Sequence, residues 1–390
     1  MYFITNGAEA TDAVFDENDK TVAVICTLSA WEQILLLSRM FTLDYFERLC
    51  FHRSLNGFHL MSTFNGWIVA MENLTRLEVT DSPGFGIEMI GQFLRAVSKS
   101  RIQYLNVSGM ALGVEGARLL CKAVKESGRI HTVRADRNQM QTGVRQVLEL
   151  GLRRVTVGEN DVHRLWWPKY FNGISPKVRR LGLENSRIGE LGFHALSRYI
   201  AHSRLVELDL GHNELKMASI KSLCLGLVDH AHLSMLHLNN CRLQNGGVKL
   251  IAAMLPLNHS LQQLYMHGNP SIDETGQLYL IKALQSNFTL WYLEIDVLFD
   301  VKCDHFPPAL VKESRLNVNP AEPVTAHLTG LVCANQDLDL ATQFWQPRLH
   351  RYYPEKMRQR VDILVQLLSP ILPHELILHI LSFWKGIQFT

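Results

Sequence analysis

Apolar residues recur along the chain in a short pattern that repeats many times. The pattern has Leu, Ile or Val at most of its first, fourth and sixth positions, polar residues between them, and Asn or a substitute at the ninth. Nine copies in this frame begin at Leu74, Ile102, Ile130, Leu152, Val178, Leu205, Leu233, Leu261 and Leu290. Successive copies begin 22 to 29 residues apart. Self-similarity of this period is typical of a solenoid, in which each copy buries its apolar face against its neighbours.

Each copy predicts one short strand followed by one helix. The alternation of apolar and polar residues over the first six positions has the period of a strand with one buried face. At the ninth position the chain must turn, and an inward polar side chain can satisfy backbone groups of adjacent copies. This position holds Asn138, Asn160, Asn213 and Asn269, with Ser82, Ser186 and Cys241 as substitutes, whereas Met110 and the poor match near Leu298 break the ladder. Helical spacing follows in residues 113–128, 188–203, 217–231, 246–258 and 274–287.

One copy departs from this pattern. Residues 161–177 read DVHRLWWPKYFNGISPK where a regular helix is expected. One interpretation is that the aromatic side chains fill the space of the missing helix. The other is that Trp166 and Trp167 belong to a protruding loop that contacts a partner, because Trp and Tyr dominate interface hot spots.

The two ends of the chain differ from the repeats. Residues 1–73 are predicted to form an N-terminal cap, with helical material in residues 29–55, because an apolar solenoid end must be covered. The repeats then occupy residues 74–299. Eight of the thirteen prolines lie between Pro307 and Pro373, so residues 300–354 are expected to form a C-terminal cap and connector. Residues 355–390 are expected to form a helical hairpin.

The nine copies resemble the leucine-rich repeats of the ribonuclease-inhibitor-like subfamily, in which a strand alternates with a full helix about every 28 residues. The resemblance implies an α/β solenoid, or horseshoe, with parallel strands on the concave face and helices on the convex face. It also implies a protein that binds other proteins on the concave face, although the fold alone does not name the partner.

In this architecture the third and fifth positions of each copy point to the concave face. Copies three to five contribute arginines there or nearby, and the later copies contribute His, Tyr and Trp. A basic zone next to an aromatic zone predicts a docking surface for an acidic, partly apolar protein segment. The candidate binding residues are Arg134, Arg137, Arg154, Arg180, Asp209, His237, Tyr265, His267, Trp291 and Tyr292. The alternative is a polar, solvated face with no partner.

Composition narrows the function further. A formal net charge of +2 argues against a nucleic-acid binder. No apolar stretch suits a membrane span or a secretory signal, and the seven cysteines form no C-x-x-C pair. We therefore expect a monomer with reduced thiols in the cytosol or nucleus.

Signals for catalysis and cofactors are weak. The sequence contains no phosphate-binding loop, no nucleophile elbow and no H-E-x-x-H metal motif, so neither an enzyme nor a cofactor is expected. The Ran GTPase activators carry similar repeats together with an acidic tail, but this tail is not acidic. Regulation of a small GTPase is therefore a distant alternative.

The last segment, LPHELILHILSFW at residues 372–384, has an apolar helical face. Its opening resembles an F-box, which would dock on a Skp-type adaptor of a cullin ubiquitin ligase through Leu372, Pro373, Glu375, Leu376, Ile380, Leu381 and Trp384. Only nineteen residues run from Leu372 to the last residue, so the F-box would be truncated. A SOCS-box-like segment that binds elongin and cullin, or a helix that simply packs on the repeats, are the alternatives.

Overall fold

The computed structural model describes residues 2–15, 20–55, 61–284, 286–287, 289–290 and 292–296. Twelve strands occur in these residues and follow one another in sequence order. The strands are β1 (Tyr2–Ile4), β2 (Thr21–Val24), β3 (Arg48–His52), β4 (Arg76–Thr80), β5 (Tyr104–Asn106), β6 (Thr132–Arg134), β7 (Arg154–Thr156), β8 (Arg180–Gly182), β9 (Glu207–Asp209), β10 (Met235–His237), β11 (Gln263–Tyr265) and β12 (Tyr292–Glu294). All nine predicted repeat strands, β4 to β12, are thus confirmed.

A helix follows almost every strand. The helices are α1 (Gly7–Asp12), α2 (Ala30–Met40), α3 (Met61–Ala70), α4 (Ile87–Lys99), α5 (Gly113–Ser127), α6 (Gly143–Leu148), α7 (Trp167–Phe171), α8 (Glu190–His202), α9 (Met217–Leu227), α10 (Asn245–Met254) with a 3-10 turn η1 (Leu255–Leu257), and α11 (Glu274–Leu284). The five predicted repeat helices are confirmed as α5, α8, α9, α10 and α11. The shortest copy, which spans 22 residues, leaves room only for the six-residue α6.

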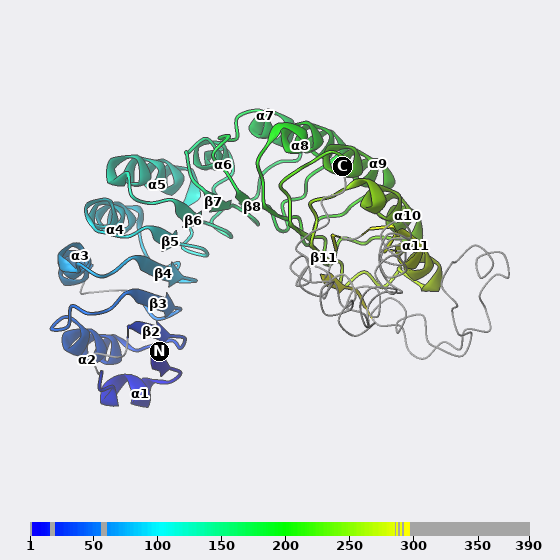
Figure 1. Ribbon diagram of the computed structural model, residues 1–390. Coiled ribbons are helices and arrows are strands. Elements are labelled where there is room, and N and C mark those ends of the chain that lie inside the picture. The colour runs from blue at the N-terminus through cyan, green and yellow to red at the C-terminus, as the bar shows by residue number, and fades with distance from the viewer. Residues whose placement is uncertain are drawn as a thin grey trace, which may run out of the picture. The chain divides into compact units, whose positions relative to one another are not determined.

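The chain divides into two compact units. The first consists of residues up to Ala195 together with Ser203–Asp209, and the second of Leu196–His202 together with the chain from Leu210 onward. In the first unit β1 to β9 pair in parallel, each with the next. In the second unit β10, β11 and β12 do the same. Within each unit the helices lie on one face of the strands (Figure 1). We refer to the other face as the open face.

The apolar positions of the pattern build the core between strands and helices. The fourth position of each copy faces the same position of the next, as in the pairs Leu77 with Leu105 and Leu236 with Leu264. These four side chains are buried. Burial of an aliphatic side chain contributes about 1.5–3 kcal/mol, so this column stabilises every strand pair against a slip in register.

Asparagines at the ninth position form the predicted ladder of buried hydrogen bonds. Asn138 Nδ2 donates to the carbonyl oxygen of Val107 at 2.8 Å, and Asn138 Oδ1 accepts from the backbone N–H groups of Met110 and Leu112. Asn269 accepts in the same way from two backbone N–H groups of the preceding copy. Each asparagine therefore satisfies backbone groups that would otherwise be buried without a partner.

The residue before this ladder adopts the left-handed conformation in eight consecutive copies. These eighth-position residues are Asp81, Gly109, Arg137, Glu159, Asn185, His212, Asn240 and Gly268, with φ between 46° and 71°. Only two of them are glycine, although a non-glycine residue in this region costs about 1 kcal/mol. The turn geometry is thus imposed by the ladder and the sheet rather than by local preference.

The first 73 residues contain more than the predicted helical cap. Helix α2 lies within the expected helical material, but β1, β2 and β3 also extend the sheet of the first unit. Residues 46–55, FERLCFHRSL, fit the repeat frame, with Phe46, Leu49 and Phe51 buried at its apolar positions. This copy does not match the aliphatic pattern, because Phe46 and Phe51 replace the expected aliphatic residues. The domain boundaries proposed after residues 73, 299 and 354 stay predictions, and residues 300–390 lie outside the described residues.

Candidate protein-binding surfaces

The third and fifth positions of the repeats occupy the open face, as the pattern predicts. Side chains at the third position are half-buried or exposed in most copies, whereas those at the fourth are buried. The alternation of a pleated strand causes this difference, because successive side chains point to opposite faces. The open face is therefore lined by seven of the predicted residues, namely Arg134, Arg154, Arg180, Asp209, His237, Tyr265 and Tyr292, whereas Arg137 and His267 follow the ends of β6 and β11.

The arginines of the first unit do not form the isolated basic zone that the sequence suggested. The Glu207 carboxylate forms ion pairs with both Arg154 and Arg180, with N–O distances of 3.1 Å and 3.4 Å. The three residues stand at the third position of consecutive strands, β7, β8 and β9, and the Glu207 side chain is only 17% exposed. We call these three residues the Glu207 cluster. One carboxylate thus compensates much of the charge of two guanidinium groups.

Arg134 is also engaged. Its Nε lies 3.7 Å from the carboxylate of Asp136, which is half-buried and accepts hydrogen bonds from the Thr156 hydroxyl at 2.6 Å and the Gly158 backbone N–H at 2.8 Å. Burial raises the pKa of Asp136 above its ordinary value, and the hydrogen bonds and Arg134 oppose this shift. Through these two hydrogen bonds Asp136, just after β6, is linked to the end of β7.

Two further ion pairs of this face involve residues of its N-terminal strands. Arg137 contacts Asp81 at 3.1 Å, and Arg76 contacts Glu78 at 2.7 Å while its guanidinium lies 3.8 Å from the centre of the Tyr104 ring. The acidic partners Glu78, Asp81, Asp136 and Glu207 were absent from the predicted site. The spacing Arg-x-Glu at residues 76–78 and Arg-x-Asp at residues 134–136 places both members on one face of a strand, and this signal was available in the sequence.

In the second unit the open face carries stacked rings. His237 and Tyr265 are register partners on β10 and β11, with ring centres 4.3 Å apart and planes only 12° apart. Tyr292 on β12 continues this row, 5.0 Å from Tyr265. His267 lies 3.2 Å from the Glu294 carboxylate. The structure therefore brings together four of the predicted aromatic or imidazole side chains of the second unit.

Other predicted residues are placed separately or not described. Asp209, half-buried, ends β9 in register with Gly182. Trp291 lies outside the described residues, as do the predicted adaptor-binding residues Leu372, Pro373, Glu375, Leu376, Ile380, Leu381 and Trp384.

In the irregular copy the structure supports the first interpretation for Trp167, and partner contact through Trp166 stays a prediction. Trp167 and Phe171 are buried and stack on each other, and Trp167 Nε1 donates to the Ser186 carbonyl oxygen at 2.9 Å. These side chains fill the space of a longer helix. Trp166, next to them, is 39% exposed, and Leu165 is 62% exposed.

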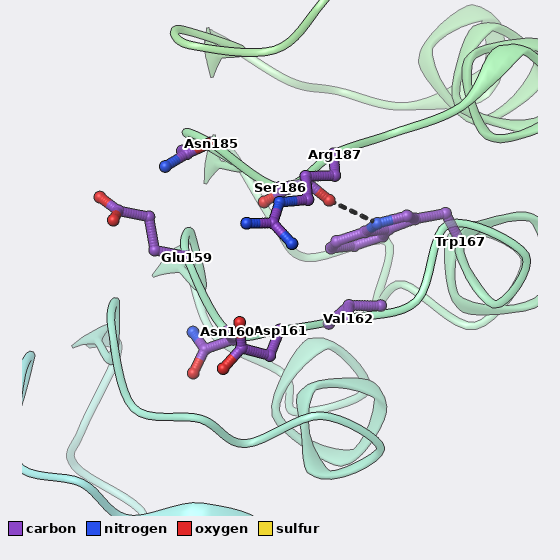
Figure 2. Close-up of a pocket in the computed structure, with 8 residues that line it drawn as sticks. All are labelled: Glu159, Asn160, Asp161, Val162, Trp167, Asn185, Ser186 and Arg187. Carbon is purple, nitrogen blue, oxygen red and sulfur yellow. Dashed lines mark hydrogen bonds between the residues drawn. The ribbon is translucent and has the colours of Figure 1, made fainter.

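A pocket opens beside the irregular copy. It is lined by Glu159, Asn160, Asp161, Val162, Trp167, Asn185, Ser186 and Arg187. Figure 2 shows that these residues come from the turns after two neighbouring strands, β7 and β8, with the Trp167 ring at one side. We call this site the turn pocket. It lies at the edge of the sheet where the strands end, whereas most of the predicted docking residues lie along the strands.

We also searched the described residues for a catalytic triad and for a metal site. His52 Nδ1 approaches both the Thr80 hydroxyl, at 3.0 Å, and the Asp81 carboxylate, at 3.3 Å. Because one ring nitrogen makes both contacts, the carboxylate does not orient His52 as a base toward Thr80, as a catalytic triad requires. Among the described residues no group of three or more His, Cys, Asp or Glu side chains is arranged to hold a metal ion. None of the helices in this part of the chain is long and apolar enough to span a bilayer.

The parallel strands, the turn with its asparagine ladder and the following helix define a leucine-rich repeat protein, and this chain is one. The chain is also similar in sequence to known proteins, among them two ribonuclease inhibitors. The chain is 26% identical to the ribonuclease inhibitor of Mus musculus over 245 residues, which cover 59% of this chain and 53% of that protein. It is 33% identical to the ribonuclease inhibitor of Sus scrofa over 141 residues, which cover 35% of this chain and 30% of that protein.

A further relative is the NACHT, LRR and PYD domains-containing protein 12 of Mus musculus, 28% identical over 170 residues that cover 42% of this chain and 16% of that protein. The chain thus spans about half or less of the length of these relatives. No protein-family model matches it. Among solved structures, the leucine-rich repeat-containing protein LegL7 from Legionella pneumophila is 14% identical, with a TM-score of 0.47 over 84% of this chain and 97% of that one.

Proposed function

We propose that this protein is a non-enzymatic binding protein that captures a protein partner on the open face of its sheet. The observation that carries the proposal is the open face itself, which no described helix covers and which holds charged and aromatic side chains at fixed spacing. Side chains of both signs favour a protein surface over a nucleic acid, whose phosphates would select cations alone.

The ion pairs change the kind of partner that we expect. Since Glu207 already compensates Arg154 and Arg180, a purely acidic segment gains less there than the sequence suggested. A partner with charges of both signs matches this part better, while the rings of His237 and Tyr265 offer flat apolar area in the second unit. We therefore propose a folded partner with a mixed surface.

Two finer versions of this function remain proposals. In the first, the chain is a substrate adaptor that recruits a cullin ubiquitin ligase through residues 372–384, using a Skp-type adaptor or elongin. In the second, it is a scaffold or inhibitor in the manner that the name ribonuclease inhibitor gives to two of its relatives, without ligase recruitment. Regulation of a small GTPase is a third and more distant version. For all of them we propose a cytosolic or nuclear location.

Site-specific photo-cross-linking in cells tests the open face directly. A photoreactive phenylalanine analogue replaces Arg180 or Tyr265 on the open face, and Lys122 on α5 or Leu225 on α9 as matched positions on exposed helix surfaces. We expect one protein to be cross-linked from the first pair and not from the second, identified by mass spectrometry. Cross-links from the helix positions alone would contradict the proposal. Repeating the capture without residues 371–390 separates the versions, because only the adaptor version loses Skp, elongin or cullin subunits.

A further inference from the structure

The open face of the second unit carries a carboxylate that no described arginine or lysine compensates. The third and fifth positions of β10, β11 and β12 hold Met235, His237, Gln263, Tyr265, Tyr292 and Glu294. With histidine neutral, Glu294 is the one residue of this described set that carries a formal charge. The side chain of Glu294 is 39% exposed, whereas that of Glu207, which pairs with two arginines, is 17% exposed. A cationic group of a partner therefore gains more at Glu294 than at Glu207.

The Glu294 carboxylate also keeps its capacity to accept hydrogen bonds. The Nδ1 atom of His267 lies 3.2 Å from this carboxylate but makes no hydrogen bond to it. No other described residue donates to the Glu294 side chain. Asp296 differs, because the backbone N–H groups of Gly268 and Asn269 both donate to its carboxylate. Of these two acidic side chains, Glu294 is therefore the one that can accept hydrogen bonds from a partner.

Aromatic rings lie beside this carboxylate. Tyr265 is the register partner of His237 on one side and of Glu294 on the other. Its ring stacks on His237, with centres 4.3 Å apart, and lies 5.0 Å from the Tyr292 ring. These contacts hold the Tyr292 ring on the open face, where 39% of this residue stays exposed. Because the face of an aromatic ring carries partial negative charge, the ring and the carboxylate attract the same kind of group, a cation.

We propose that Tyr292 and Glu294, which we call the β12 site, bind an arginine side chain of the protein partner. The two residues stand two positions apart on one strand, so they point to the same face about 7 Å apart. The guanidinium lies flat on the Tyr292 ring, and its N–H groups donate to the Glu294 carboxylate. A lysine can pair with Glu294 but has no planar group to stack on the ring. This inference rests on the proposed function and adds a basic side chain to the expected partner.

Nuclear magnetic resonance of ¹³C-labelled histidine rings in the full chain tests the β12 site with defined peptides. The probes are acetyl-Gly-Arg-Gly-amide and its analogues with lysine or with citrulline, which has the shape of arginine without its charge. His267 reports binding because it lies next to Glu294, and its signal is assigned with the His267→Gln variant. We expect the arginine peptide to shift this signal at a concentration about tenfold lower than the citrulline peptide and about threefold lower than the lysine peptide. His194, which is exposed on α8, is the internal control and should not move.

Matched variants attribute the effect to the site. Glu294→Gln should weaken binding of the arginine peptide about fivefold, whereas Glu214→Gln, an exposed carboxylate of the same unit, should leave it unchanged. Tyr292→Leu should weaken binding about threefold and remove the preference for arginine over lysine. Tyr279→Leu, which replaces a tyrosine on α11, should do neither.

Three results would overturn the proposal: equal binding of the arginine and citrulline peptides, unchanged binding by the Glu294→Gln variant, or no shift of His267 at all. Without peptide, a His267 signal that changes on dilution of the protein would overturn it by assigning the site to a second copy. One that changes in the Arg358→Gln variant would do so by assigning it to this chain's own C-terminal segment.

The cross-linking in cells gives a separate answer about the proposed function. A partner cross-linked from Tyr265, together with no binding of the arginine peptide, would reject the β12 site alone. Binding of the arginine peptide, together with no partner cross-linked from the open face, would reject the proposed function alone.

Discussion

The Glu207 cluster and the turn pocket both carry charged side chains of the first unit, but they use them differently. In the cluster, one carboxylate pairs with both Arg154 and Arg180. In the turn pocket, Asp161 and Arg187 are near each other in the lining but form no ion pair. Charges that compensate one another stabilise the sheet and give little to a partner, whereas uncompensated charges are available for binding. The number of arginines in a surface is therefore a poor measure of its attraction for anions.

The largest expected effect concerns Asn160, which is buried and lines the turn pocket. Its Nδ2 group donates to the carbonyl oxygens of Ala135, Val157 and Gly158, and it also lines the turn pocket. Asn160→Ala leaves these buried groups unsatisfied, so we expect a loss of about 3 kcal/mol in the free energy of unfolding, measured by urea denaturation. Unchanged stability would show that water replaces the ladder at this copy.

A smaller effect is expected at Glu207. Glu207→Gln removes the charge shared by Arg154 and Arg180, and because these arginines are partly solvated we expect a loss of about 1 kcal/mol in the free energy of unfolding. The double variant Glu207→Gln with Arg180→Gln should recover part of this loss. If Glu207→Gln is as stable as the wild-type protein, the cluster is not compensated in the way described.

Removing the charges of the turn pocket should leave the stability almost unchanged. Asp161→Asn and Glu159→Gln remove charges that have no described partner. We therefore expect each variant to change the free energy of unfolding by less than about 0.5 kcal/mol, measured by urea denaturation. A clear loss of stability in either variant would mean that these carboxylates have a structural partner. The contrast between paired charges in the Glu207 cluster and unpaired charges in the turn pocket would then be wrong.

The smallest expected effect is electrostatic and concerns Cys50 on β3. Burial, with a contribution from the Glu78 charge, raises the pKa of its thiol from 9.0 to about 11. At pH 8 its thiolate fraction is then about a hundredfold below that of an ordinary thiol, and alkylation should be slower by about this factor. Glu78→Gln should accelerate alkylation of Cys50 but not of buried Cys121, whose pKa is also about 11. Residue-resolved mass spectrometry measures both.

The same shift predicts how stability depends on pH. Below about pH 9 the Cys50 thiol is protonated in the folded and the unfolded chain, so its contribution is constant. Between pH 9 and 11 the unfolded chain releases the proton first, and stability falls as the pH rises. Cys50→Ser should reduce this fall in alkaline urea titrations. An unchanged pH dependence would place the titrating group elsewhere.

The strands and turns of the fold could be predicted from the sequence, but the ion pairs between charged side chains of different strands could not. A period-two pattern with an asparagine at a fixed place predicts strand and turn, because burial and backbone hydrogen bonds allow few alternatives there. The copy at Phe46 escaped this pattern because its apolar residues are aromatic. The pairing of Arg180 with Glu207 depends on the register of two strands 27 residues apart in sequence, which no single copy reveals. The turn pocket likewise joins turns of two copies.

The asparagine ladder has a consequence for how such a chain changes over generations. The Asn138 side chain bonds to backbone groups of its own copy and of the copy before it, and its backbone N–H donates to Asn160 of the copy after it. A whole copy can therefore be duplicated or deleted by recombination without new partners being needed elsewhere. The number of copies, and with it the length of the open face, can then change during evolution while the geometry of each turn stays the same.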